Sequence, residues 1–224
     1  MIGPFNYPVA LSLIPVISAI AAGNCVVLKP SELCPNVSQS FELLTQYLDS
    51  QCFALVQGGI EETQKLLKTR FDYIFFTGSE RVGKIVARAA AENLTPVTLE
   101  LGGKCPAVVD GTFDLEVAAK RILVNKWVNS GQTCIAPDFA LVHESVYDKF
   151  CDLIKSALDS FTEGKPALES KSFSRIVSSS HVNRLASLIK SSGGQIIGGG
   201  EFDVEQKFVA PMLIRDVPLD SPVS

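Results

Sequence analysis

The chain has 224 residues and a formal net charge of −4; 46% of its residues are hydrophobic and 20% are charged. This balance is typical of a globular protein with a substantial apolar core, and the lack of any basic cluster excludes a nucleic-acid-binding surface. Six cysteines are scattered without a Cys-x-x-Cys pair or a histidine at zinc-ligand spacing. The sequence therefore predicts a reduced, cytoplasmic protein and no metal site.

An apolar run at residues 9–22 is the first predicted element. It is too short to span a membrane as a helix, and it contains Pro15. No lysine or arginine precedes it, which argues against a secretory signal peptide. We therefore expect a buried helix of an α/β domain.

Short apolar strands then alternate with helical patterns. Strands are expected at residues 25–28, 52–56, 73–76 and 96–99, and helices at residues 37–48, 61–68 and 80–92. This alternation indicates βαβ units and a parallel sheet. The uninterrupted apolar run Ile74-Phe75-Phe76 indicates a strand that is buried on both faces.

The pattern becomes less regular after Gly102, where we place a soft domain boundary. Strands are expected at residues 107–109, 139–142 and 195–197, and helices at residues 115–128, 145–158 and 182–189. Asp114 is placed to cap the first of these helices. The predicted fold class is α/β: a doubly wound, Rossmann-like parallel sheet in residues 1–102 and part of a second α/β domain in residues 103–224.

Two strand ends carry residues suited to a nucleotide. Gly78 and Ser79 join a strand to a helix, where free N–H groups and the helix dipole favour a phosphate; alternatively, Ser79 is an ordinary N-cap and Gly83 serves helix packing. Lys29 and Glu32 follow another strand end, where ligands of open α/β sheets bind. They either hold ribose hydroxyls or belong to a capping box at a helix start, and local chemistry leaves both alternatives open.

Three further residues are candidates for catalysis. Cys134, at the end of Gly-Gln-Thr-Cys, is a possible nucleophile, and Glu100, followed by Leu-Gly-Gly-Lys, is a possible general base. Asn6 lies in a rigid turn between two prolines and could donate to an oxyanion. Taken singly, each has an ordinary structural explanation as a buried thiol, a solvated or ion-paired carboxylate, and a turn asparagine.

Together these segments resemble the active site of the aldehyde dehydrogenase superfamily, in that family's order. They are residues 4–8 (Pro-Phe-Asn-Tyr-Pro), 29–32 (Lys-Pro-Ser-Glu), 76–79 (Phe-Thr-Gly-Ser), 100–104 (Glu-Leu-Gly-Gly-Lys) and 131–134 (Gly-Gln-Thr-Cys). The tail Ile135-Ala136-Pro137-Asp138 resembles the class 3 branch, which acts on medium- and long-chain or aromatic aldehydes.

The resemblance implies oxidation of an aldehyde to a carboxylic acid with NAD(P)+, with residues 1–102 as part of the cofactor domain and residues 103–224 as part of the catalytic domain. Cys134 would attack the aldehyde, Asn6 and the Cys134 backbone N–H would hold the oxyanion, and Glu100 would activate water. The cofactor would contact Lys29, Glu32, Gly78, Ser79, Gly83 and Leu101. A carboxylate near the ribose repels a 2′-phosphate, so NAD is favoured, with NADP possible.

The resemblance also implies that family members extend beyond both ends of this chain. An N-terminal section, most of the strand leading into Pro4, and the segment after Ser224 are expected to be missing, so the chain alone is expected to be poorly active or inactive. The main alternative is a truncated chain that binds a nucleotide or a partner without turnover, and another is an esterase that uses Cys134 and Glu100. The expected partners are a small aldehyde and, for the full-length protein, a second copy, with no nucleic acid and no membrane.

Overall fold

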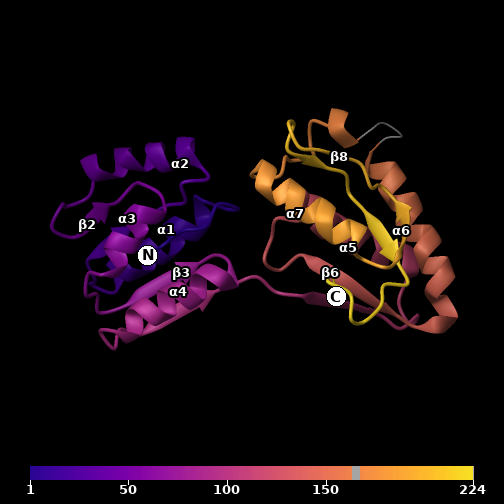
Figure 1. Ribbon diagram of the computed structural model, residues 1–224, viewed down its shortest axis with the longest axis horizontal. Helices are drawn as coiled ribbons and strands as arrows, with labels where there is room; N and C mark the ends of the chain where they lie inside the picture. Colours follow the sequence, from indigo (N-terminus) through magenta and orange to yellow (C-terminus); the bar gives the residue numbers. More distant parts are fainter. Residues whose placement is uncertain (163–166, 224) are drawn as a thin grey trace. The chain divides into compact units, whose positions relative to one another are not determined.

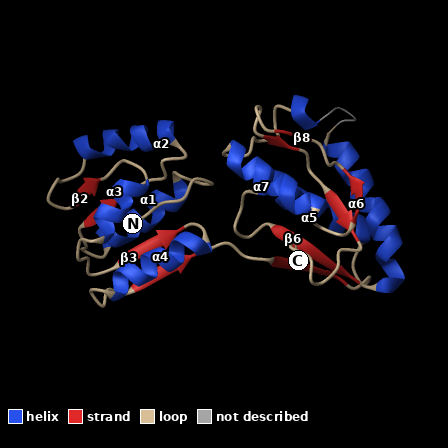
Figure 2. Cartoon of the chain, in the orientation of Figure 1, coloured by secondary structure: helices blue, strands red, loops and turns tan. Residues whose placement is uncertain are grey.

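The computed structural model describes residues 1–162 and 167–223. The chain divides into two compact units, Met1–Gly102 and Gly103–Ser224 (Figure 1), and each is described by itself. Both units combine helices with short strands (Figure 2), which confirms the predicted α/β class. In the described part of the chain, no helix is both long enough and apolar enough to cross a membrane.

The first unit alternates strands and helices as predicted, with small shifts at the ends of the elements. Its strands are β1 Val26–Leu28, β2 Phe53–Leu55, β3 Ile74–Thr77 and β4 Val97–Glu100. Its helices are α1 Ala10–Ala21, α2 Pro35–Ser40, the 3-10 helix η1 Phe41–Gln46, α3 Ile60–Leu67 and α4 Glu80–Ala91.

The strands of the first unit run parallel, and residues 1–3 complete their sheet. β1 pairs with β2, β3 pairs with β4, and Ile2 forms parallel bridges to both Lys29 and Phe76. The spatial order is therefore β2, β1, residues 1–3, β3, β4, which is the 3-2-1-4-5 order of a doubly wound sheet. Residues 1–3 thus occupy the central position of the sheet.

Two hydrophobic cores hold the helices of the first unit to its strands. One joins α1 and η1 to β1 and β2 through Val16, Val26, Leu28, Phe41 and Phe53. The other joins α3 and α4 to β3 and the start of the chain through Ile2, Leu67, Ile74, Phe76, Val86 and Ala90. The helices before and after the reversal in strand order therefore pack in separate clusters, which is expected for a doubly wound sheet.

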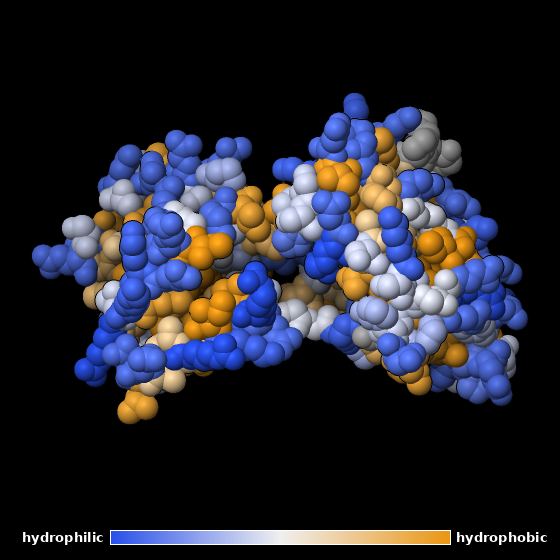
Figure 3. All heavy atoms as spheres, in the orientation of Figure 1, coloured by the Kyte–Doolittle hydropathy of each residue, from blue (hydrophilic) through white to orange (hydrophobic). Residues whose placement is uncertain are grey.

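Helix α1 is less buried than its composition suggests. Its residues Ile14 and Ile17 are 61% and 63% exposed, whereas Ser12 and Val16 are buried. Apolar side chains are also visible among charged ones on the surface of this unit in Figure 3. The prediction of a helix is confirmed, but the prediction that the helix is buried holds for only one of its faces.

The helix expected at residues 37–48 changes character after Ser40. Hydroxyl groups bond to carbonyls three residues back: Ser40 Oγ donates to the Val37 carbonyl and Thr45 Oγ1 donates to the Glu42 carbonyl, both at 2.7 Å. Such bonds compete with the regular helical pattern. The second half of the segment is accordingly the 3-10 helix η1.

The described part of the second unit contains one parallel and two antiparallel strand pairs. β5 Cys105–Val109 runs parallel to β6 Pro137–Val142, β7 Gln195–Gly198 runs antiparallel to β10 Leu213–Arg215, and β8 Phe202–Asp203 runs antiparallel to β9 Phe208–Val209. Its helices are α5 Leu115–Trp127, η2 Val128–Gly131, η3 Glu144–Val146, α6 Tyr147–Phe161, η4 Ala167–Glu169 and α7 Ser179–Lys190. The sequence predicted the longer elements and missed β8, β9 and β10.

An aromatic core anchors the helices of the second unit. The rings of Trp127 and Phe173 have centroids 4.7 Å apart. They pack with Leu123, Ala157, Leu158, Ala167, Phe208 and Ala210.

At the N-terminal end of α5, Asp114 Oδ1 accepts hydrogen bonds from the backbone N–H groups of Glu116 and Val117 at 2.9 and 3.1 Å, which confirms the predicted cap.

Candidate functional site

Lys29 and Glu32 form an ion pair just beyond the carboxyl end of β1. The Lys29 side chain is 2% exposed, and its Nζ donates to the Pro30 carbonyl at 2.9 Å and to Glu32 Oε2 at 3.1 Å. A buried ammonium requires such partners. The alternative of a capping box is wrong, because α2 begins only at Pro35 and no side chain caps it.

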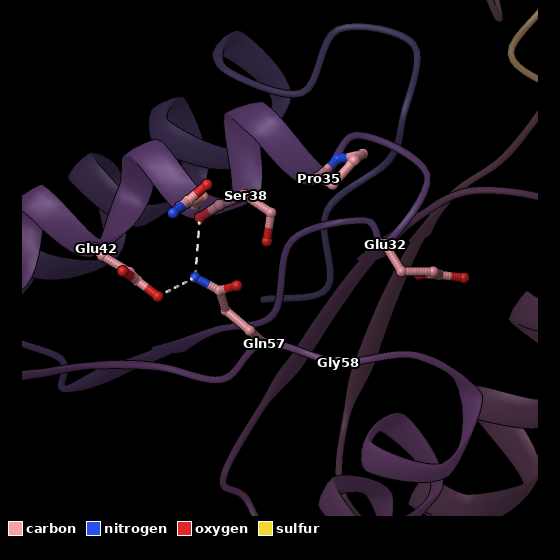
Figure 4. A pocket seen from close by; sticks show the side chains of 7 residues that line it. Glu32, Pro35, Ser38, Glu42, Gln57 and Gly58 are labelled. Atoms are coloured by element: carbon pink, nitrogen blue, oxygen red, sulfur yellow. Dashed lines mark hydrogen bonds between the residues drawn. The ribbon is translucent and has the colours of Figure 1, made fainter.

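A pocket of about 350 Å³ opens beside Glu32. It is lined by Glu32, Pro35, Ser38, Gln39, Glu42, Gln57 and Gly58. Figure 4 shows the Gln57 amide between two acceptors: Nε2 donates to the Ser38 carbonyl at 3.2 Å and to Glu42 Oε1 at 2.9 Å. Glu42 and Gln57 belong to none of the motifs described above, so the sequence did not indicate that these two side chains are hydrogen-bonded.

The turn at Gly78 and Ser79 joins β3 to α4. Ser79 is the N-cap of α4, and its Oγ accepts from the Val82 N–H at 3.4 Å, so the N-cap interpretation is confirmed. A Cβ on Gly83 would lie 2.9 Å from Leu101 Cδ2, which confirms that Gly83 serves helix packing. Gly78 N donates to the Glu100 carbonyl, and the exposed Ser79 and Glu80 leave the first turn of α4 accessible to solvent.

Glu100 and Asn6 lie at the same edge of the sheet as these turns. Glu100 ends β4 opposite Thr77 of β3, and its side chain is exposed. Asn6 follows the central residues 1–3 in the turn that leads into α1, where Cys34 Sγ donates to the Phe5 carbonyl at 3.1 Å. Because parallel strands end at one edge, the first unit gathers its candidate residues along that edge, on both sides of the point where the strand order reverses.

Cys134 lies in the second unit on a loop with unusual backbone geometry. The preceding residues Asn129, Ser130 and Gly131 have φ values of +54°, +53° and +72°. This left-handed region is unfavourable for residues with a Cβ and is often occupied at functional sites. The Cys134 side chain is exposed, so the ordinary explanation of Cys134 as a buried structural thiol does not apply.

Gln132 fixes this loop to a segment that is remote in the sequence. Its Nε2 donates to the carbonyls of Asn129 and Arg175, both at 3.0 Å, and its Oε1 accepts from the Val177 N–H at 2.9 Å. Ser130 Oγ donates to the Ser174 carbonyl at 2.5 Å. The sequence placed Gln132 within a motif but did not indicate these partners.

The residues after Cys134 are held by charge. Asp138, at the start of β6, forms ion pairs with Lys104 and with Lys126, the second at 3.5 Å. On the other side, Cys105 Sγ donates to the carbonyl oxygen of Cys134 at 3.4 Å. The thiol loop is therefore bounded by a hydrogen-bonded clamp before Cys134 and by ion pairs after it.

Known proteins match the whole of this chain. The model of the aldehyde dehydrogenase family matches residues 1–224. The chain is 47% identical over 224 residues to 4,4′-diaponeurosporen-aldehyde dehydrogenase of Staphylococcus aureus, covering 100% of this chain and 49% of that protein. It is 48% identical over 225 residues to aldehyde dehydrogenase family 3 member H1 of Arabidopsis thaliana, covering 99% and 46%. The solved substrate-bound state of Staphylococcus aureus AldH matches with a TM-score of 0.92 and 47% identity over 99% of this chain and 48% of that one.

The first unit has a doubly wound sheet, and the second unit has an exposed cysteine, so the chain is an α/β protein with an accessible thiol. The chain belongs to the aldehyde dehydrogenase family. Its relatives include class 3 members, as the sequence indicated. The chain spans about half the length of the curated relatives it matches.

Proposed function

We propose that the protein to which this chain belongs oxidises an aldehyde to a carboxylic acid with NAD(P)+, and that Cys134 is its nucleophile. The observation that carries this proposal is the construction of the thiol loop. Cys134 is exposed, it follows residues in left-handed conformation, and Gln132 clamps its loop to residues 175 and 177. A structural thiol needs no such arrangement, whereas a nucleophile must be both accessible and held in place.

In this mechanism the Cys134 thiolate adds to the aldehyde carbon and forms a thiohemiacetal. As the family resemblance implies, the Asn6 amide and the backbone N–H of Cys134 would donate hydrogen bonds to the oxyanion that develops. Loss of hydride leaves a thioester on Cys134, and Glu100 takes a proton from the water that hydrolyses it. The exposed position of Glu100 at the end of β4 supports this role, because water reaches its carboxylate directly.

The first unit offers a donor set that fits a dinucleotide, and we propose that it is the cofactor-binding part. The ion-paired Lys29 and Glu32 would bind ribose hydroxyls, and the pocket of about 350 Å³ beside them is large enough for a nucleoside. The N-terminus of α4 at Gly78 and Ser79 would hold the pyrophosphate, with Gly83 and Leu101 packing the helix against β4. When bound, the nicotinamide supplies the acceptor for the hydride.

NAD is the cofactor we propose, in preference to NADP. Glu32 and Glu42 both line the pocket beside Lys29. Two carboxylates create a negative potential that repels a 2′-phosphate, while Glu32 accepts hydrogen bonds from a 2′-hydroxyl. The buried Lys29 ammonium is already paired with Glu32 and the Pro30 carbonyl, so it is poorly placed to offset that repulsion.

The decisive experiment is aldehyde-dependent NADH formation by the natural full-length protein, with a medium-chain aldehyde, beside Cys134→Ala and Glu100→Gln variants. We expect no turnover without Cys134, and with Glu100→Gln we expect an acyl adduct on Cys134 that mass spectrometry detects. Undiminished turnover by Cys134→Ala would overturn the proposal. For the 224-residue chain alone we expect little or no turnover, and a rate near that of the full-length protein would contradict that expectation.

A further inference from the structure

Two cysteines of the second unit lie close together at the candidate nucleophile. Cys105 Sγ is 3.4 Å from the carbonyl oxygen of Cys134 and is hydrogen-bonded to it. A carbonyl oxygen lies about 2.4 Å from its own Cα, so the Cys105 sulfur is no more than about 6 Å from the Cα of Cys134. In a disulfide, a sulfur lies about 4 Å from the Cα of the partner cysteine, so rotation of the side chains with a loop shift of up to about 2 Å brings the two sulfurs within bonding reach.

The surroundings of the pair leave room for this movement. Gly103 lies beside both residues: a Cβ there would be 3.3 Å from Cys105 Sγ and 3.4 Å from the Cys134 carbonyl oxygen. Solvent reaches both thiols, because Cys134 is exposed and Cys105 is only partly buried. Cys105 begins the strand β5 at an irregularity in its pairing with β6, and Ile135, next to Cys134, is 79% exposed.

The third cysteine of the second unit is less well placed than Cys105. Cys151 lies within helix α6, and burial raises the pKa of its thiol, which lowers the fraction present as reactive thiolate. Among the hydrogen bonds that the cysteine sulfurs make in the described part of the chain, the bond from Cys105 Sγ is the one made to the Cys134 loop.

We propose that Cys105 is a resolving thiol for Cys134, so that hydrogen peroxide converts the pair to a disulfide. The Cys134 thiolate attacks one peroxide oxygen, the O–O bond breaks, and the released hydroxide takes up a proton, leaving a sulfenic acid and water. The Cys105 sulfur then attacks the Cys134 sulfur, the S–O bond breaks, and the hydroxide leaves with the thiol proton as a second water. Two thiols are oxidised by two electrons and one peroxide is reduced to two waters.

The pair would protect Cys134 from irreversible damage. An isolated sulfenic acid is oxidised further to sulfinic and sulfonic acids, which thiols do not restore, whereas a disulfide is reduced by thiol exchange. A consequence that rests on the proposed function is that oxidation stops turnover reversibly. The disulfide itself depends only on the two residues and does not require the chain to be active.

The test is peptide mass spectrometry on the 224-residue chain after treatment with a small excess of hydrogen peroxide and alkylation of the remaining thiols. We expect a cross-linked peptide pair that contains Cys105 and Cys134, is two hydrogens lighter than the reduced pair, and disappears with dithiothreitol. In Cys105→Ser the cross-link should be absent and Cys134 should proceed to the sulfinic and sulfonic forms. Cys151→Ser, the matched control, should keep the cross-link.

Two results would overturn the proposal. One is a wild-type chain in which Cys134 reaches the sulfinic form while Cys105 stays reduced, and the other is a disulfide that joins Cys134 to a different cysteine. Thermal unfolding of each variant shows whether it folds, and Cys105→Ala provides a second replacement if the serine disturbs β5. Because the readout is a mass, failure of the full-length protein to oxidise aldehydes would refute the proposed function and leave this result unaffected.

Discussion

The Gln132 side chain is the part of the thiol loop whose contribution is most directly measurable. It donates to the carbonyls of Asn129 and Arg175 and accepts from the N–H of Val177, at 3.0, 3.0 and 2.9 Å. Gln132→Leu keeps a side chain of similar size and removes all three hydrogen bonds. The variant therefore isolates the clamp from the packing around it.

The expected loss follows from the number of bonds and their exposure. Each hydrogen bond contributes about 1 kcal/mol net, so three contribute about 3 kcal/mol when nothing replaces them. Gln132 is half-buried, and water can satisfy some of the released carbonyls. Release also lets Asn129 and Ser130 leave the left-handed region, which holds about 1 kcal/mol of strain per residue. We expect the free energy of unfolding to fall by about 2 kcal/mol.

Urea unfolding measures that loss, and hydrogen exchange locates it. The Val177 amide depends on Gln132 Oε1 for its protection, so in Gln132→Leu its exchange should accelerate by at least about tenfold. Gln132→Glu keeps an acceptor for Val177 but loses both donors, and should fall between the wild type and the leucine variant. Gln64→Leu, an exposed glutamine of α3, is the control. Unchanged unfolding together with an unchanged Val177 amide in Gln132→Leu would refute the reasoning.

Three further predictions concern the first unit. Burial lowers the pKa of the Met1 amino group from 8.0 to about 6; the unfolded chain therefore binds a proton between these pH values that the folded chain does not, and the free energy of unfolding should fall by about 2 kcal/mol as the pH falls from 8 to 6. Urea unfolding should show this loss with a free Met1 amine but not after N-terminal acetylation. Gly78→Ala would place a Cβ 2.6 Å from the buried Phe76 ring and should cost about 1–3 kcal/mol, whereas a Cβ on Gly102 meets nothing within 4 Å; equal melting temperatures for the two alanine variants would contradict this. Glu32→Gln should raise the ratio of kcat/KM for NADP to that for NAD about tenfold in the full-length protein, and an unchanged ratio would show that Glu32 does not face the 2′-position.

The first unit follows from the sequence because its signals are local. Continuous apolar strands and helices of ordinary length recur at regular spacing, which is sufficient to predict parallel βαβ units. Two features were beyond that reasoning. Residues 1–3 are too short to carry a periodic signal, yet they bridge Lys29 and Phe76 in the centre of the sheet. The hydroxyl bonds that convert the end of the predicted helix at residues 37–48 to a 3-10 helix depend on rotamers that composition does not reveal.

The short strands of the second unit illustrate a different reason for failure. β8 and β9 have two residues each, and the left-handed Lys207 lies in the turn between them. A lysine in that conformation gives no turn signal of the kind that glycine or asparagine gives. The pairing is instead supported by Phe208, which is buried in the aromatic core with Trp127 and Phe173. Tertiary packing thus decides where these strands form.

The candidate site likewise has a part that follows from local sequence signals and a part that depends on tertiary contacts. In the first unit, Lys29, Gly78 and Glu100 reach one edge of the sheet because parallel strands end together, so their grouping follows from the alternation of elements. In the second unit, the setting of Cys134 is made by Gln132, whose partners Arg175 and Val177 lie 43 and 45 residues further along the chain. Those partners are main-chain groups, so the hydrogen bonds of Gln132 constrain the backbone of the remote segment and do not depend on its side chains. The sequence at residues 175–177 therefore carries no pattern that predicts them. Cys134, the proposed nucleophile, is therefore the residue whose surroundings are least predictable from the sequence. It follows Asn129 and Ser130, which adopt a left-handed backbone conformation that residues with a Cβ disfavour.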